Sequence, residues 1–159
     1  SDLKPLSMFR ICWLACMAPL IAACSTPPPP FDQQTTLRCD DCRTTPVLGI
    51  VDGDTLDTPP GRIRLFGVDT PERGERCYKE AKGRLRALAG NLVRVEPGPR
   101  DQDRGGRLLL YVYTESGISI DETLIREGLA VAWTRDGQHR DLLVALAKEA
   151  QTTGTGCLW

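Results

Sequence analysis

Two carboxylates, three residues apart, follow a short apolar stretch that contains one arginine. The stretch runs from Ile63 to Val68 and continues as Asp69-Thr70-Pro71-Glu72. If it is a strand, Arg64 lies on a half-buried face, where a cation costs free energy unless an anion or a ligand pairs with it. Proline disfavours the helical region for the residue before it, so Asp69, the Thr70 carbonyl and Glu72 are expected at the rim of the strand. An arginine paired with a nearby acid, followed by a proline turn, explains the same residues without any chemistry.

A second acidic motif, Asp52-Gly53-Asp54-Thr55, precedes this strand. As a hairpin turn it is commonplace. If the strands on either side pair as a meander, however, Asp54 lies near Asp69. Two carboxylates and the Thr70 carbonyl are hard oxygen ligands that suit Ca²⁺ or Mg²⁺, with water in the remaining positions.

Arg107 follows the pair Gly105-Gly106 and opens a further apolar run. Glycine lets the backbone come close to a ligand, and a guanidinium at that point can hold two phosphate oxygens. Arg64 and Arg107 would then flank one anion, with Glu72 beside it. A cation, two arginines and a carboxylate that activates or orients water suit the hydrolysis of a phosphodiester. Each arginine can also be an ordinary surface or turn residue.

The elements that must position these residues are short. Apolar periodicity and turn signals predict five strands, at Val47–Val51, Thr55–Leu56, Arg62–Val68, Leu92–Val95 and Leu108–Tyr113, with a loop at Pro97–Pro99 and a further strand-like run at Leu129–Trp133. They predict helices at Arg76–Ala89, Asp121–Glu127 with Asp121 or Ser119 as its cap, and Gln138–Ala150. The predicted fold is α+β and mainly β, a small five-stranded barrel packed with about three helices.

Charge and histidine content limit the function classes. The 159 residues carry a formal net charge of −1 at pH 7. A protein that binds nucleic acid through nonspecific phosphate attraction is usually basic, so any polyanion must here be held locally. The single histidine, His139, is expected to be solvated on the last helix. Its solitude argues against histidine-centred nuclease chemistry and against a Ser-His-Asp triad.

The first 24 residues have the features of a targeting segment. Lys4 and Arg10 precede an apolar run, Ile11 to Ala23, that is too short to span a bilayer. The small residues before Cys24 resemble the lipobox of bacterial lipoproteins, in which that cysteine is acylated. Residues 1–24 are therefore expected to be a lipoprotein-type signal peptide, with a plain secretory signal as the alternative. The resemblance implies a lipid anchor in the bacterial envelope, at the outer membrane, or a periplasmic or secreted protein.

Residues 25–45 are expected to form a tether and residues 46–159 a single domain. Four consecutive prolines, Pro27 to Pro30, favour an extended spacer. Four of the seven cysteines lie beyond Cys24, which suggests two disulfides with three possible connectivities. Pairing of Cys39 with Cys42 and of Cys77 with Cys157 is favoured, but a redox pair or half of a zinc site at Cys39-Asp40-Asp41-Cys42 is open.

Four motifs together resemble the staphylococcal-nuclease-like, or thermonuclease, family. They occur in the family's order and at close to its spacing, from about Val47 to Trp159. The motifs are Val51-Asp52-Gly53-Asp54-Thr55, Ile63-Arg64-Leu65 with Val68-Asp69-Thr70-Pro71-Glu72, Asp103-Arg104-Gly105-Gly106-Arg107, and Leu124-Ile125-Arg126-Glu127-Gly128-Leu129-Ala130.

The resemblance implies an OB-fold barrel and a Ca²⁺-dependent endonuclease, with Mg²⁺ as the alternative metal, that cuts DNA and RNA and leaves 3′-phosphate ends. It implies that Asp54 and Asp69 are metal ligands through their side chains and Thr70 through its carbonyl. Arg64 and Arg107 would bind the scissile phosphate, and Glu72 would act as general base or orient water. A monomer is expected, and no protein partner is implied.

The chain departs from the family pattern at three places. Gly105 stands where the family commonly has an aromatic residue, the loop Arg73–Arg76 is short, and Trp133 is the rough counterpart of base-stacking tyrosines, a candidate substrate contact. These changes affect affinity more than chemistry. The alternative is a catalytically weak nucleic-acid-binding module on the same fold: Gly105 and the acidic balance count for it, and the presence of the full set of site residues counts against it. A thiol-redox protein using Cys39 and Cys42 is a third reading that lacks the expected βαβ context.

Overall fold

The computed structural model describes residues 35–159. The predicted signal peptide, the lipidation site Cys24 and the four prolines lie outside the described residues. Within residues 35–159, none of the helices has the length and apolar character needed to cross a membrane.

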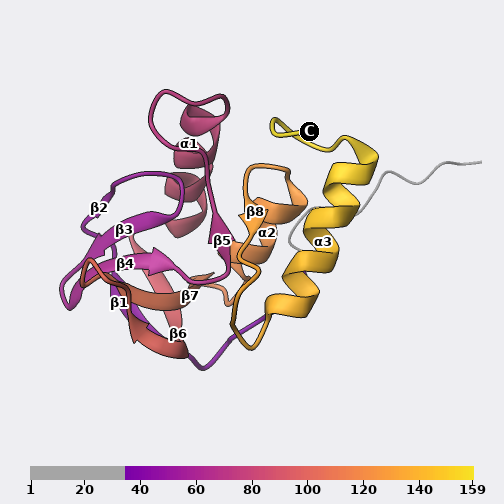
Figure 1. The fold of residues 1–159 in the computed structure, drawn as a ribbon. Helices are drawn as coiled ribbons and strands as arrows, with labels where there is room; N and C mark the ends of the chain where they lie inside the picture. The colour runs from indigo at the N-terminus through magenta and orange to yellow at the C-terminus, as the bar shows by residue number, and fades with distance from the viewer. Residues whose placement is uncertain (1–34) are drawn as a thin grey trace, which may run out of the picture.

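A curled sheet of six strands forms one side of the molecule (Figure 1). The predicted meander is present: β2 (Gly49–Ile50), β3 (Thr55–Thr58) and β4 (Gly61–Leu65) pair in antiparallel order. On its other edge, β4 pairs in parallel with β7 (Leu108–Thr114), and β6 (Leu92–Gln102) joins β7 to β1 (Arg43–Pro46). A separate short pair, β5 (Val68–Asp69) with β8 (Val131–Ala132), carries the chain past the end of β4.

Three helices pack around this sheet, as predicted. They are α1 (Tyr78–Ala89), α2 (Ile120–Arg126) and α3 (Arg140–Thr153). Ser119 caps α2, because its side-chain oxygen accepts a hydrogen bond from the Glu122 amide. In Figure 1, α1 stands above the sheet and α3 runs along its side. The expected class, mainly β with an OB-like curled sheet and three helices, is confirmed.

The strands differ from the prediction in three places. The proline-rich loop at 97–99 is part of β6, which continues to Gln102 with its pairing register shifted after Pro97. The strand bends there over the ring of Phe66. The backbone comes so close to this ring that a Cβ added at Gly98 would lie 2.5 Å from Phe66 Cδ2. The strand predicted at Leu129–Trp133 shrinks to the two residues of β8. In addition, β1 begins at Arg43, so three of its four residues belong to the segment 25–45 that the sequence assigned to the tether.

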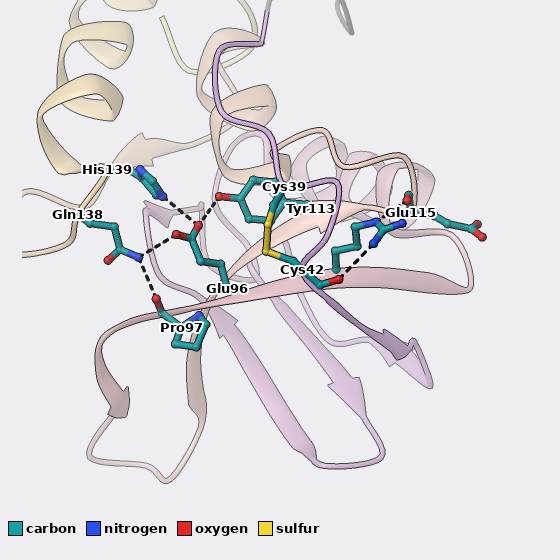
Figure 2. Close-up of a disulfide and its surroundings, with 9 residues drawn as sticks. Cys39, Cys42, Glu96, Pro97, Tyr113, Glu115, Gln138 and His139 are labelled. Atoms are coloured by element: carbon teal, nitrogen blue, oxygen red, sulfur yellow. Dashed lines mark hydrogen bonds and ion pairs between the residues drawn. A yellow bond between two sulfur atoms is a disulfide. The ribbon is translucent and has the colours of Figure 1, made fainter.

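Two disulfides join Cys39 to Cys42 and Cys77 to Cys157, the pairing that the sequence favours. The first lies in the segment that precedes β1 (Figure 2). That segment also joins the rest of the fold through backbone bonds, since Cys39 N donates to Gly117 O and Ser119 N donates to Leu37 O. The second disulfide connects residues 80 positions apart and brings the C-terminus to the start of α1.

Candidate functional site

Arg64 projects from β4 over the turn that follows this strand. Its Nη1 donates to the carbonyl oxygens of Leu65 at 3.1 Å and Val68 at 3.0 Å, and its Nη2 donates to Asp69 Oδ1 at 2.6 Å. The same Nη2 lies 3.5 Å from Asp54 Oδ2. The cation in the apolar stretch is therefore paired, and its partners are the two aspartates that the sequence named as metal ligands.

Asp54 is 6% exposed and is held on several sides. Its Oδ2 accepts the Thr70 amide at 3.0 Å and its Oδ1 accepts the Thr55 hydroxyl at 2.9 Å. Burial raises the pKa of the Asp54 carboxyl, and the nearby Asp52 adds to this, while Arg64 and the Thr70 and Thr55 hydrogen bonds oppose it. A negative charge at this position is thus only partly compensated by the protein.

The hairpin that carries Asp54 depends on one glycine. A Cβ at Gly53 would lie 2.6 Å from the Thr70 hydroxyl and 2.9 Å from Ala81 Cβ, so only glycine fits without a shift. Asp52 Oδ1 accepts the Asp54 amide at 3.2 Å and shapes the turn. This close approach brings the Asp54 turn against Thr70, although sixteen residues separate them.

The turn between β4 and β5 is held from below by Asp121. This residue is fully buried, and its two oxygens accept the amides of Gly67 at 2.8 Å and Val112 at 3.1 Å. Burial raises the pKa of Asp121 to about 6. Asp121 does not reach the rim, so its role is to position the turn over which Arg64 folds.

Asp54 and Asp69 suit a hard cation that needs few protein ligands. One oxygen of each lies within 3.5 Å of the same Arg64 nitrogen. Asp69 is exposed, and Thr70 is attached to Asp54 through its amide. Within residues 35–159, no group of three or more His, Cys, Asp and Glu side chains gathers as a metal cluster. The residues therefore fit a loosely held ion such as Ca²⁺ or Mg²⁺, with room for water or substrate.

Arg107 lies on the other side of Arg64 and depends on Asp103. Asp103 Oδ1 accepts the amides of Gly105 and Arg107, and its Oδ2 accepts Arg107 Nε at 2.6 Å. Although partial burial acts in the opposite direction, the Arg107 hydrogen bonds lower the pKa of Asp103. Arg64 and Arg107 line one pocket of about 220 Å³ together with Phe66, Arg100, Asp103, Leu109 and Trp133.

This pocket opens beside a wider hollow of about 880 Å³ that we call the arginine groove. Four arginines line the groove, and Trp133 stands at its boundary with the pocket, since it lines both. The Arg135 and Arg64 guanidinium carbons lie 5.1 and 5.9 Å from the Trp133 ring centre. Trp133 Nε1 donates to Asp136, which also pairs with Arg100. The four arginines are Arg100, Arg104, Arg107 and Arg135.

Glu72 lies apart from the other candidate residues. Its backbone amide donates to the Glu75 carboxylate at 2.7 Å, while its own carboxylate forms no hydrogen bond or ion pair with the part of the chain that the structure describes. It is exposed on the loop between β5 and α1, three residues after Asp69. The structure thus groups Asp54, Arg64, Asp69, Thr70, Arg107 and Trp133 around one opening and leaves the carboxylate of Glu72 unpaired.

His139 is half-buried and paired, unlike the solvated residue that the sequence predicted. Its Nε2 lies 2.9 Å from Glu96 Oε2, and its ring meets Tyr111 edge-on. Figure 2 shows that the Glu96 carboxylate also receives the Tyr113 hydroxyl, while Gln138 bonds both Glu96 and the Pro97 carbonyl. This cluster joins the start of α3 to β6 and β7.

Sequence reasoning gave no role to the other three arginines of the groove, nor to the two aspartates that pair with Arg100 and Arg107. Arg100 and Arg135 lie in segments whose local pattern indicates only loops. Asp103 had a usable signal, since an aspartate two residues before a glycine pair often accepts the turn's amides. No local signal indicated the contact between residues 100 and 136, because this contact depends on how β6 bends.

The comparisons with known proteins identify the family of this chain. The profile of staphylococcal nuclease homologues matches residues 62–159. The chain is 33% identical to a thermonuclease of Staphylococcus hyicus over 122 residues, 69% of this chain and 72% of that protein. It is 31% identical to a micrococcal nuclease of Shigella flexneri over 126 residues, 71% of each.

A third relative, from Escherichia coli O157:H7, is named an uncharacterized endonuclease and is 32% identical over 119 residues, 71% of this chain and 74% of that protein. The names of these relatives support a nuclease function. With its matched profile, its curled sheet and its paired acidic and arginine residues, the chain belongs to the family of staphylococcal nuclease homologues.

Proposed function

We propose that this protein is a metal-dependent endonuclease that hydrolyses phosphodiester bonds in DNA and RNA and leaves 3′-phosphate ends. One observation carries the proposal: Arg64 contacts both Asp54 and Asp69 and lines, with Arg107, the pocket beside the arginine groove. The Arg64 guanidinium thus lies beside both the proposed ligands of the cation and the proposed site of the phosphate.

The cation would be held by the side chains of Asp54 and Asp69 and the carbonyl of Thr70, with Ca²⁺ or Mg²⁺ as the ion. When bound, such an ion neutralises negative charge that develops on the phosphate. The partly compensated charge of buried Asp54 favours its binding, because a cation offsets the cost of keeping that carboxylate ionised.

The arginines would hold the phosphate. Arg64 must exchange its ion pair with Asp69 for phosphate oxygens, and Arg107 must do the same with Asp103. Both guanidiniums offer two donors in a planar fork that matches phosphate geometry. Once they hold the phosphate, the two arginines stabilise the negative charge that develops in the transition state.

Glu72 would take a proton from the attacking water or orient that water. Its carboxylate is exposed and unpaired within residues 35–159, so it is available to accept a proton. No sulfur or histidine nucleophile is required, since the half-buried His139 is occupied with Glu96.

The arginine groove would hold the nucleotides next to the scissile bond. Its arginines meet backbone phosphates, and an unpaired base would stack against Trp133, which favours single strands or locally opened duplexes. Local arginines thus offset the balanced charge of the whole chain.

We also propose that the protein works in the bacterial envelope. Two disulfides in residues 35–159 suit an oxidising compartment. The signal-like residues 1–24, with acylation at Cys24 and the proline tract beyond it, would attach the domain to the outer membrane.

The test is digestion of single-stranded DNA, duplex DNA and RNA with Ca²⁺, Mg²⁺ or a chelator, comparing the protein with Glu72→Gln, Arg64→Ala and Arg62→Ala. Arg62 is a matched control, because it lies on β4 two residues from Arg64 and pairs with Asp57 at the surface. Metal-dependent cleavage that is lost in the first two variants and retained in the third is expected. Binding without cleavage under any condition would instead support the binding module.

A further inference from the structure

The loop that carries Glu72 has little of its own to fix its position. Residues 72–76 are all exposed. The Glu72 amide donates to the Glu75 carboxylate, and the Glu75 amide donates to the Glu72 carbonyl at 2.9 Å. These bonds define the shape of a small turn, but they do not attach the turn to the sheet that carries Arg64.

The attachment comes from the C-terminal residues. Cys77 is 4% exposed and is bonded to Cys157, and the Arg76 guanidinium donates to the Cys157 carbonyl. Leu158 lines a pocket of about 200 Å³ together with Asp69, Thr70, Pro71 and Glu75. The last residues of the chain therefore contact the end of the loop that leads into α1, and Leu158 lines a pocket shared with the end that leaves β5.

The C-terminal segment is itself firmly seated. Leu158 N donates to Gly128 O at 3.1 Å. A Cβ at Gly128 would lie 1.8 Å from the Thr155 oxygen, and one at Gly156 would lie 2.0 Å from the Glu127 oxygen, so two backbones meet here at a distance that only glycine permits. Arg84 of α1 pairs with Glu127 at 2.6 Å and fixes the same corner.

The backbone at Cys77 also depends on this attachment. Its φ of 70° is the only positive value at a non-glycine residue in the described residues 35–159, and its side chain does not cap α1. A left-handed conformation is unfavourable for such a residue and persists only where the surroundings impose it. The partner sulfur of Cys157 supplies that constraint.

We propose that the Cys77–Cys157 disulfide is a positioning element for Glu72, so that cleavage of nucleic acid requires the oxidised protein. The inference rests on the proposed role of Glu72 in that reaction. Reduction by a dithiol such as dithiothreitol breaks the S–S bond, gives two cysteine thiols, and leaves the dithiol as its own cyclic disulfide. The Glu72 loop then loses its covalent link to the C-terminus, and the nuclease stays weak until it reaches an oxidising compartment.

The Cys39–Cys42 disulfide is a built-in control. It joins two cysteines that are only three positions apart in the sequence. Hydrogen bonds hold both of them, since Cys39 N donates to Gly117 O at 2.9 Å and Arg94 Nη1 donates to Cys42 O at 3.1 Å. Closing a short loop restrains the chain much less than closing one of 80 residues. Its removal should leave the Glu72 loop in place.

The first experiment measures the loop without relying on catalysis. Trypsin cuts after arginine, and the loop offers Arg73 and Arg76. In the full chain, Cys77→Ser/Cys157→Ser is compared with Cys39→Ser/Cys42→Ser below the melting temperature, and cuts are located by mass spectrometry. Cleavage after Arg73 and Arg76 is expected to be at least about tenfold faster in the first variant, while Arg94 in β6 stays protected in both. Equal rates in the two variants would overturn the proposal.

The second experiment separates positioning from general stability. Removal of the Cys77–Cys157 disulfide is expected to lower kcat at least about tenfold while the affinity for a short oligonucleotide, measured with a chelator present, stays within about twofold. In the Glu72→Gln background the same removal should change kcat little, because both changes act through one carboxylate. Reoxidation of reduced protein should restore kcat. Loss of affinity in parallel with kcat, or full additivity with Glu72→Gln, would contradict a positioning role.

The two experiments also distinguish this inference from the proposed function. If oxidised protein cleaves nothing with any metal, the nuclease proposal and the catalytic part of the inference fail, while the trypsin comparison still decides whether the disulfide places the loop. If reduced and oxidised proteins cleave equally, the inference fails and the nuclease stands.

Discussion

The acidic rim and the arginine groove of this site are built in opposite ways. The rim consists of Asp54, Asp69 and Thr70, which come from two neighbouring segments of the chain. The carboxylate of Asp54 is buried. The groove draws arginines from β6, the turn after it and the segment after β8, and most of its charge is exposed. Arg64 lies between the two and contacts the rim while lining the pocket.

This difference explains how a chain of balanced charge can have a place for a polyanion. Separating the two signs over a short distance creates a local positive field beside the proposed cation site, although the net charge is −1. We therefore expect changes in the rim to affect turnover and changes in the groove to affect affinity.

The largest effect is expected from Asp54→Asn. Loss of this carboxylate removes a ligand of the proposed cation, so kcat should fall about 100-fold or more, as measured by single-turnover cleavage at saturating Ca²⁺. The melting temperature should stay the same or rise, because burial already disfavours the ionised form. Asp57→Asn, at an exposed position on β3, is the control. An active Asp54→Asn enzyme would remove the cation site from the proposal.

Trp133→Ala should instead weaken substrate binding. Loss of one stacked base costs about 1–3 kcal/mol, or roughly 5- to 150-fold in Kd for single-stranded DNA by fluorescence titration with a chelator present. Trp133→Phe keeps a ring and should retain most of the affinity. If alanine and phenylalanine weaken binding alike, the contribution of Trp133 lies in its bond to Asp136 and its packing.

Arg104→Gln should produce a smaller and purely electrostatic loss. Arg104 lines the groove and has no ion pair among residues 35–159. Its loss should weaken binding evenly across sequences and reduce the slope of log K against log salt by about one. Arg62→Gln, outside the groove, should leave that slope unchanged. A sequence-dependent loss would indicate a base contact in place of a phosphate contact.

The smallest effect is expected from Asp121, which supports the turn between β4 and β5. It should appear in the pH dependence of stability. Burial raises the pKa of Asp121 to about 6, so the folded protein binds more protons than the unfolded chain between about pH 4 and pH 6. The contribution of Asp121 to the free energy of unfolding should therefore decrease as pH rises through this window and level off above it.

Urea unfolding of the wild type and Asp121→Asn from pH 4 to pH 7 measures this contribution as the difference between the two proteins. Glu96 offers a contrast, because hydrogen bonds from Tyr113 and His139 outweigh burial and lower its pKa, so its stabilisation is lost as pH falls. A difference that stays constant or increases with pH would show that Asp121 is not held in its neutral form.

Much of the fold could be predicted because its signals are local. Apolar periodicity indicated the meander and all three helices, and residue type left Ser119 and Asp121 as candidates for the cap of α2, of which the structure has Ser119. The predictions failed where a tertiary contact overrode the local pattern. Proline and glycine at 97–99 indicated a loop, yet β6 continues through them because it bends over Phe66. Residues 43–45 lie in the segment assigned to the tether, yet they pair with β6.

The sequence by itself determined the residues of the rim, because Asp54, Asp69 and Thr70 lie in two short motifs within sixteen positions of one another, and their residue types and spacing suffice to name them. Only the tertiary structure decided the rest. The bend of β6 brings Arg100 to Asp136, and the return of the C-terminus brings Cys157 to Cys77. Both contacts join residues far apart in the chain, and such contacts follow from the packing of the whole core, which no local pattern encodes.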